Sequence, residues 1–79
     1  MPTIFIINGY RFFFFSNEGN EPVHVHVEKD HKYAKFWLKP LSLARNYKFN
    51  YRELGQMMRM IEARKVEIEE KWNEHFNQS

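Results

Sequence analysis

The sequence lacks cysteine altogether, which excludes disulfide bonds and thiolate metal ligands as sources of stability. Three glycines and three prolines are too few for a flexible linker or a low-complexity segment. A chain of 79 residues has room for one hydrophobic core, and domains of this size commonly gain stability from association when they have no disulfide or metal. We therefore expect a single domain over residues 1–79 that associates with another chain.

Long apolar runs and a strong charge imbalance are also missing. Asn8, Gly9 and Arg11 interrupt the apolar N-terminal segment, which is therefore too short to cross a membrane. No basic region precedes this segment and no small-residue cleavage site follows it, as a signal peptide would require. The net charge of +2 is compatible with nucleic acid binding but does not require it. We expect a cytoplasmic protein that does not contact a membrane and needs no cofactor.

Aromatic residues, in contrast, are abundant and make up 18% of the chain. Asn8 and Gly9 separate two β-prone runs, and this dipeptide favours a type I′ turn, which requires positive φ at both central positions. The sequence thus predicts a β-hairpin over residues 3–15. Both of its faces are largely apolar, so one covers the core and the other needs a cover from this chain or from a second molecule. The predicted pairs are Ile7 with Tyr10, Phe5 with Phe12 and Ile4 with Phe13.

The stretch PVHVHVE at residues 22–28 alternates, so its valines point to one side of a strand and its histidines and Glu28 point to the other. A two-residue turn at Asp30 and His31 predicts a second hairpin over residues 23–38. One face of this hairpin is apolar and must be core, whereas the other face is aromatic and charged. The predicted core pairs are Val23 with Leu38, Val25 with Phe36 and Val27 with Ala34, and the pairs on the other face are His24 with Trp37, His26 with Lys35 and Glu28 with Tyr33.

The C-terminal part of the sequence predicts a helix over about residues 51–77. Asn50 is a good N-cap, and Glu53 follows three residues later in the position that completes a capping box. The apolar stripe of this helix is longer than a small sheet can cover, so the helix either bends near Ala63 and Arg64 or packs its end against another chain. The stripe consists of Leu54, Met57, Met58, Ile61, Ile68, Trp72 and Phe76.

The fold class predicted from these elements is α+β, an antiparallel meander of four or five strands with a long C-terminal helix on one face. Residues 41–50 are ambiguous between a short edge strand and one helical turn, and the strand is favoured. If the partner is a second copy of the chain, we expect the two copies to associate through hairpin 3–15 or through the C-terminal helix.

Several motifs in the chain are similar to those of one family. They are MPTI at the N-terminus, NGYRF at residues 8–12, PVHVHV at 22–27, AKFW at 34–37 and WNE at 72–74. Through these motifs nearly the whole chain resembles the small bacterial proteins known as domain of unknown function 4160. Members are commonly encoded beside a second small protein, often of an uncharacterised family numbered 2442, in an arrangement like that of a toxin and its antitoxin. The resemblance therefore implies a cognate antitoxin-like partner and a toxin-like role.

The sequence departs from this family pattern at two positions. Val23 stands where a second proline is frequent, and Lys48 stands where a glycine is frequent before Phe49. The lysine puts in doubt a tight turn at residues 47–49, because a left-handed backbone conformation favours glycine.

The histidine face of residues 24–28 has three chemical interpretations, of which two involve chemistry at the imidazoles. As a metal site, His24 and His26 both reach one ion, but Lys35 beside His26 disfavours a dication, so no metal ligand is predicted. As a catalytic site, His24 and His26 supply the proton transfers that metal-independent RNA cleavage requires, and Lys35 or Arg11 supplies the positive charge. Glu18 or Glu28 would orient one imidazole. The residues leave open whether the protein is an enzyme.

The third interpretation is a binding surface, because aromatic and cationic side chains together suit the stacking of RNA bases or the anchoring of a protein. A simpler alternative is that the histidines only occupy the solvent side of a sheet. Overall the sequence favours a toxin-like component that acts through an antitoxin-like partner, with RNA binding or cleavage as the first alternative and metal binding as the second. The predicted binding residues are Arg11, Glu18, Tyr33, Trp37 and Arg45.

Overall fold

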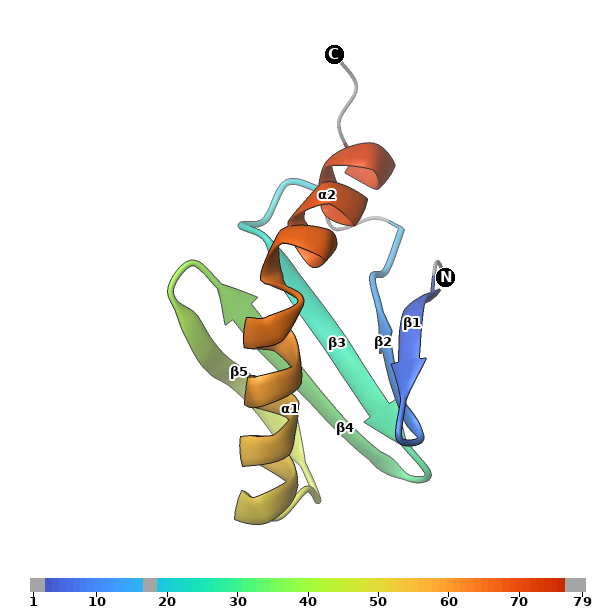
Figure 1. Ribbon diagram of the computed structural model, residues 1–79, viewed down its shortest axis with the longest axis vertical. Helices are drawn as coiled ribbons and strands as arrows, with labels where there is room; N and C mark the ends of the chain where they lie inside the picture. Colours follow the sequence, from blue (N-terminus) through green and yellow to red (C-terminus); the bar gives the residue numbers. More distant parts are fainter. Residues whose placement is uncertain (1–2, 17–18, 77–79) are drawn as a thin grey trace.

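Five antiparallel strands form one sheet, and two helices lie on one of its faces (Figure 1). The computed structural model describes residues 3–16 and 19–76. The strands are neighbours in sequence order, and no helix within these residues is long and apolar enough to span a membrane. The predicted α+β meander with a C-terminal helical region is confirmed. The elements are β1 (Thr3–Ile7), β2 (Tyr10–Phe13), β3 (His24–Lys29), β4 (Lys32–Leu38), β5 (Leu41–Tyr47), α1 (Tyr51–Ala63) and α2 (Lys65–Phe76).

The first hairpin turns at Asn8 and Gly9, whose φ angles of 51° and 82° are both positive, as a type I′ turn requires. The two predicted pairs nearest this turn are confirmed, but the pair furthest from it is wrong. The register shifts in β1, where one extra residue bulges out and bends the strand. The observed pairs include Ile7 with Tyr10, Phe5 with Phe12, and Thr3 with Phe13 in place of the predicted Ile4 with Phe13.

The second hairpin has the register that the alternating sequence predicts. Asp30 and His31 form its turn. Val23 lies just before β3, and its carbonyl oxygen accepts a hydrogen bond from the backbone N–H of Leu38 at 3.2 Å. The strand pairs are His24 with Trp37, Val25 with Phe36, His26 with Lys35, Val27 with Ala34 and Glu28 with Tyr33.

The face of the sheet beneath the helices carries the hydrophobic core. Val25, Val27 and Phe36 alternate with the residues of the other face and are each 0% exposed. Burial of an apolar side chain of this size contributes roughly 1.5–3 kcal/mol, so this face provides most of the stability of a small domain. The buried helix residues that pack onto it are Leu54, Met57, Ile61, Ile68 and Trp72.

Helix α1 begins with the predicted capping box. The side-chain oxygen of Asn50 accepts a hydrogen bond from the N–H of Glu53 at 2.8 Å, and the Glu53 carboxylate accepts one from the N–H of Asn50 at 3.0 Å. These two bonds satisfy N–H groups that have no partner within the helix. The start of the helix is therefore encoded locally.

The helical region predicted over residues 51–77 is two helices in the structure, with the break at Arg64, where a bend was one of the two predicted alternatives. Residue 77 lies outside the described residues. Helix α1 ends at Ala63, and the N–H of Arg64 donates to the carbonyl oxygens of the preceding turn. The interruption allows α2 to lean over one end of the sheet (Figure 1). There Trp72 packs edge-on against Phe14, with ring centres 5.1 Å apart.

Residues 41–47 form an edge strand, β5, so the favoured interpretation of this ambiguous segment is confirmed. The chain then turns into α1 through Lys48, which has a φ of 76°. The side chain of Asn46 stabilises this turn, because it donates to the carbonyl oxygen of Phe49 and accepts from its N–H. A turn at residues 47–49 therefore forms although a lysine occupies its left-handed position.

Candidate functional site

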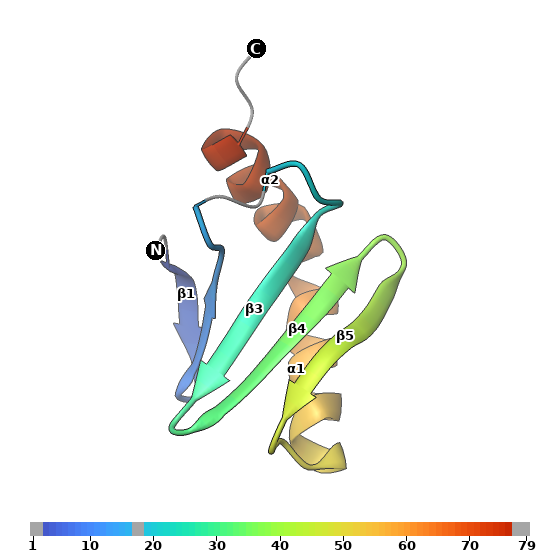
Figure 2. The same cartoon turned by 180° about the vertical axis from the view of Figure 1, so that it is seen from behind.

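The face of the sheet opposite the helices is not covered by any helix of the described residues (Figure 2). Residues that pair across strands point to the same side, so the register defines which side chains occupy this face. We call it the open face. It consists of Thr3, Ile6, Arg11, Phe13, His24, His26, Glu28, Tyr33, Lys35, Trp37, Ser42, Arg45 and Tyr47.

His24 and His26 lie on the open face, yet they are only 0% and 1% exposed. Aromatic side chains of the same face cover them. The ring of His26 stacks against Phe13 at 5.3 Å, and Phe15, just beyond β2, meets it edge-on at 4.5 Å. The interpretation of these histidines as solvent-exposed side chains of a half-wet sheet is therefore wrong.

The His24 ring occupies the boundary between the two sides of the sheet. It contacts His26 at 5.0 Å, Trp37 of the open face at 5.5 Å, and Trp72 of α2 at 5.0 Å. Helix α2 leans over the end of the sheet where β3 begins, and this is how its tryptophan reaches a residue of the opposite face (Figure 1).

Hydrogen bonds hold both imidazoles in place. The Nδ1 of His24 lies 2.9 Å from the carbonyl oxygen of Pro22, and since a carbonyl oxygen only accepts, this nitrogen is the donor. The Nδ1 of His26 lies 2.7 Å from the hydroxyl of Tyr33. These hydrogen bonds anchor the Nδ1 atom of each histidine, and the neighbouring aromatic rings hold each imidazole in the same position.

Lys35 and Arg11 are held by carboxylates and by aromatic rings. The Nζ of Lys35 donates to Glu21 at 3.0 Å and lies 4.5 Å from the centre of the Trp37 ring. Arg11 pairs with Glu28 in the same way, and its guanidinium lies over Phe13. The charges of these two cations are therefore largely compensated within the protein.

Arg45 differs from these two cations, because it is exposed and forms no ion pair with any residue that the structure describes. Near it on the open face lies Tyr47, which is 54% exposed. This corner of the face, on the edge strand β5, offers an aromatic ring and an uncompensated positive charge.

The structure thus places almost all of the predicted site residues on one face, while Glu18 lies outside the described residues. Sequence analysis did not predict the aromatic rings that cover the histidines or the ion pair between Lys35 and Glu21. The alternation of residues after the first turn signals the side that Phe13 occupies, but its contact with His26 depends on the pairing of β2 with β3. The site residues that were not predicted are Phe13, Phe15, Glu21 and Tyr47.

The burial of the imidazoles limits the chemistry that this arrangement supports. A general base must come within hydrogen-bonding distance of its substrate, and His24 and His26 are shielded by rings. Catalysis by His24, His26 and Lys35 therefore requires those rings to move aside. Among residues 3–16 and 19–76, no three His, Asp or Glu side chains lie together in a way that would hold a metal ion.

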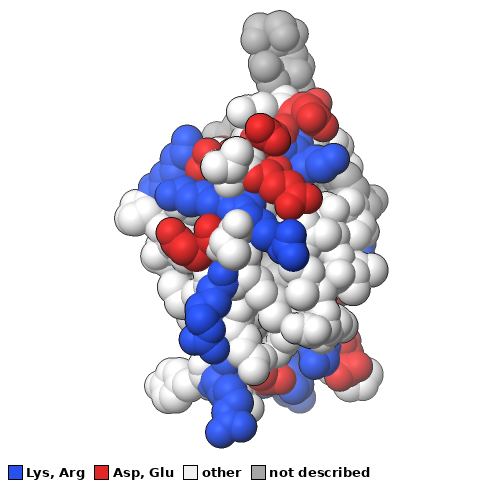
Figure 3. All heavy atoms as spheres, in the orientation of Figure 1, with Lys and Arg blue, Asp and Glu red and all other residues white. Residues whose placement is uncertain are grey.

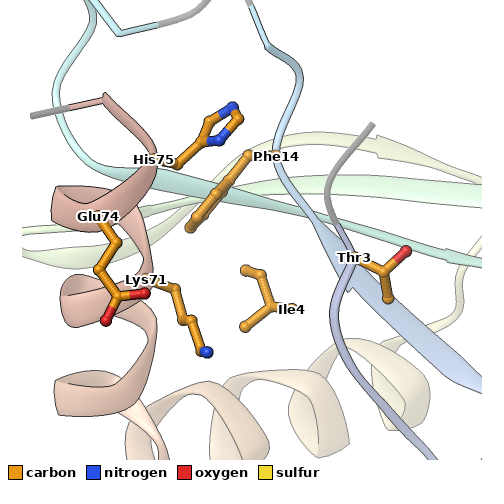
Figure 4. A pocket seen from close by; sticks show the side chains of 6 residues that line it. All are labelled: Thr3, Ile4, Phe14, Lys71, Glu74 and His75. Carbon is orange, nitrogen blue, oxygen red and sulfur yellow. The ribbon is translucent and has the colours of Figure 1, made fainter.

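A hollow lies between β1 and α2 (Figure 4). Phe14 and Ile4 contribute apolar surface, while Lys71 and His75 project from α2 toward the same space. Its volume is about 270 Å³, which is just below the usual range of small-molecule sites. Its remaining lining residues are Thr3 and Glu74.

Fold and site together define a small α+β protein that presents an aromatic and charged sheet face opposite its helices. The chain belongs to the family described as domain of unknown function (DUF4160), whose model matches residues 9–73, so the family assignment from sequence motifs is confirmed. No curated protein and no solved structure matches the chain.

Proposed function

We propose that this protein acts in the bacterial cytoplasm by binding a partner protein through the open face, as the toxin-like component of a toxin-antitoxin-type pair. The observation that supports binding is the presence of Trp37, Tyr33 and Tyr47 on a sheet face without a helical cover. Tryptophan, tyrosine and arginine are the residues that most often dominate protein interfaces. The paired role follows from what the family resemblance implies.

The pairing of cations on the open face favours a protein over an RNA as the partner. RNA binding draws much of its affinity from cations that neutralise phosphates. On the open face Lys35 and Arg11 are already paired with Glu21 and Glu28, which leaves Arg45 as the only cation there without an ion pair among the described residues. A surface whose positive and negative charges nearly cancel suits an interface with a protein that presents polar and aromatic side chains.

Co-expression with the product of the neighbouring gene tests this proposal. Tyr47→Ala removes an aromatic side chain of the open face, and Tyr51→Ala removes one that is 93% exposed at the start of α1, on the helix side. We expect Tyr47→Ala to weaken the complex about tenfold or more, which corresponds to about 1.4 kcal/mol, while Tyr51→Ala leaves it intact. Titration of the purified proteins gives both dissociation constants.

Two results would contradict the proposal. One is the absence of any complex between the two purified proteins, and the other is an equal loss of affinity in both tyrosine variants. Expression of the chain alone should slow growth, and co-expression of the partner should restore it.

RNA cleavage by His24, His26 and Lys35 remains an alternative prediction. Its test is RNA integrity in cells that express the chain, compared with cells that express His24→Gln/His26→Gln. Glutamine retains a buried polar side chain but cannot act as a general base, so RNA degradation that disappears in this variant, with the fold intact by circular dichroism, would favour the nuclease.

A further inference from the structure

The outer edge of β5 is not paired with any strand of the described chain. β5 is the last strand of the sheet, and five of its seven residues are exposed. An edge strand presents unpaired backbone N–H and C=O groups, which form a template for one more strand. The opposite edge, β1, is shorter and has no charged residue, whereas a register shift is present in both edge strands. β5 is therefore the better template.

The charged side chains of the segment that forms this edge have one sign, although Lys39 lies 3.9 Å from Glu69 of α2. Between Lys39 and Arg52 the sequence contains four cations and no aspartate or glutamate. Arg45 and Arg52 form no ion pair with the described residues, and both are exposed. Figure 3 shows lysine and arginine side chains along the side of the molecule where α1 and β5 lie, with acidic side chains among them and further acidic side chains over α2.

We infer that the β5 edge binds an extended acidic segment of a partner protein, which pairs with β5 as an additional strand. The inference rests on the proposed function, because it assigns the partner a contact and a chemical character. Backbone hydrogen bonds would hold the segment, and its carboxylates would neutralise Arg45 and Lys48, whereas Lys39 already lies 3.9 Å from Glu69.

The pleat of the sheet specifies the pattern of the bound segment. Along β5, Arg45 and Tyr47 belong to the open face, whereas Leu43, which is 43% exposed, pairs with the core residue Phe36 on the helix side. Leu43 and Arg45 lie on opposite faces although they are two residues apart, because the register of β5 shifts between them. The regularly alternating strand β4 matches this order of faces, and an added strand would match it in the same way. An alternation of acidic and β-branched residues therefore matches the edge, with acidic side chains beside Arg45 and apolar ones beside Leu43.

Charge argues against a second copy of the chain as the occupant. Two β5 strands side by side would bring Arg45, Lys39 and Lys48 of one copy close to the same cations of the other, and like charges on adjacent strands are destabilising. A nucleic acid would use the cations but would leave the strand's backbone groups and the exposed leucine without a role. An acidic peptide uses all three features.

A synthetic nine-residue peptide that alternates glutamate with valine and threonine is the probe. Its control carries the same side chains with N-methylated backbone amides, so charge is retained while strand pairing is lost. Titration into the isotope-labelled full chain should shift the backbone amide signals of β5 more than those of β1. The N-methylated peptide should bind at least tenfold more weakly.

Two charge reversals make the test specific. Arg45→Glu should weaken binding of the glutamate peptide tenfold or more, and Lys71→Glu, the same change in sign on α2, should alter it less than twofold. Both variants should retain the circular dichroism spectrum of the parent chain, since both residues are exposed.

Several results would overturn the inference. Equal binding of both peptides would mean that charge acts without strand pairing, and signal shifts confined to β1 would move the site to the other edge. A dimer of the unliganded chain that Arg45→Glu disrupts would make a second copy the occupant, and tighter binding of single-stranded RNA at β5 would make it a nucleic acid. Because the assay contains no partner protein, its failure is independent of a failure to form the complex.

Discussion

The two faces of the sheet differ in what covers them and in what they hold. Under the helices, neighbouring strands present valine, alanine and phenylalanine, and Phe36 is completely buried by apolar contacts. On the open face, the adjacent residue Trp37 is partly exposed, and its ring contacts His24. The ammonium of Lys35 lies over the same ring. Large aromatic side chains therefore bury the polar groups of this face, with Trp72 of α2 completing the cover of His24, and they keep surface for recognition.

The strongest test of this difference is a pair of adjacent substitutions in β4. Phe36→Ala removes a fully buried ring beneath the helices and should lower the free energy of unfolding by about 3–5 kcal/mol. Trp37→Ala, on the open face, should lower it by no more than about 2 kcal/mol, because solvent already reaches the ring. Urea denaturation measures both, and equal losses would contradict the assignment of stability to the covered face.

The next effect concerns the buried histidine of the open face. His26→Ala removes a ring packed against Phe13 and Tyr33 together with its hydrogen bond, so the free energy of unfolding should fall by about 2–3 kcal/mol. His31→Ala, in the exposed turn, should change it by less than about 0.5 kcal/mol. A His26→Ala variant as stable as the parent chain would show that the histidine layer is not part of the packed structure.

A smaller effect should come from the turn that directs α1 onto one face. Lys48→Gly relieves the cost of a left-handed conformation in a residue with a Cβ atom, although it also raises the entropy of the unfolded chain. The net result should be stabilisation by about 0.5–1 kcal/mol. Lys48→Ala keeps the strain and removes only the side chain, so stabilisation by both variants would refute the backbone explanation.

The smallest effect is a change in the pH dependence of stability. The Lys32 ammonium donates to the Glu53 carboxylate at 2.7 Å, and the N–H of Asn50 donates as well, so the pKa of Glu53 lies below its ordinary value of 4.5. A carboxyl group whose pKa is lower in the folded than in the unfolded chain stabilises the fold at pH values above its ordinary pKa. This contribution is lost as the pH falls through the lower, folded-state pKa.

Thermal unfolding between pH 6 and pH 2 checks this expectation. Glu53→Gln retains a capping side chain but does not titrate, so its loss of stability below about pH 5 should be shallower than that of the parent chain. Glu62→Gln, which alters an exposed carboxylate of the same helix with no ion pair among the described residues, serves as the control. An unchanged acid limb in Glu53→Gln would mean that Lys32 does not hold this carboxylate in solution.

Local patterns in the sequence were sufficient for the turns, the second hairpin and the helix start. The alternation in PVHVHVE admits one register because a slip by one residue exchanges its faces, and the capping box requires only residues 50 and 53. The bulge in β1 could not be predicted, and the break at Arg64 was one of two alternatives that the sequence left open. Both adjust the chain to a sheet of limited size, and that size is a property of the assembled fold.

The candidate site also has features that the sequence predicts and features that depend on the tertiary structure. Sequence by itself determined that the residues of the second hairpin, His24, His26, Glu28, Tyr33, Lys35 and Trp37, share the open face, since strand alternation is a local consequence of backbone geometry. Only the tertiary structure decided that His24 and His26 are buried, because their cover comes from Phe13, Phe15 and Trp72, which reach them through strand pairing and the lean of α2. Burial depends on contacts between segments distant in the chain, and such contacts leave no local signal.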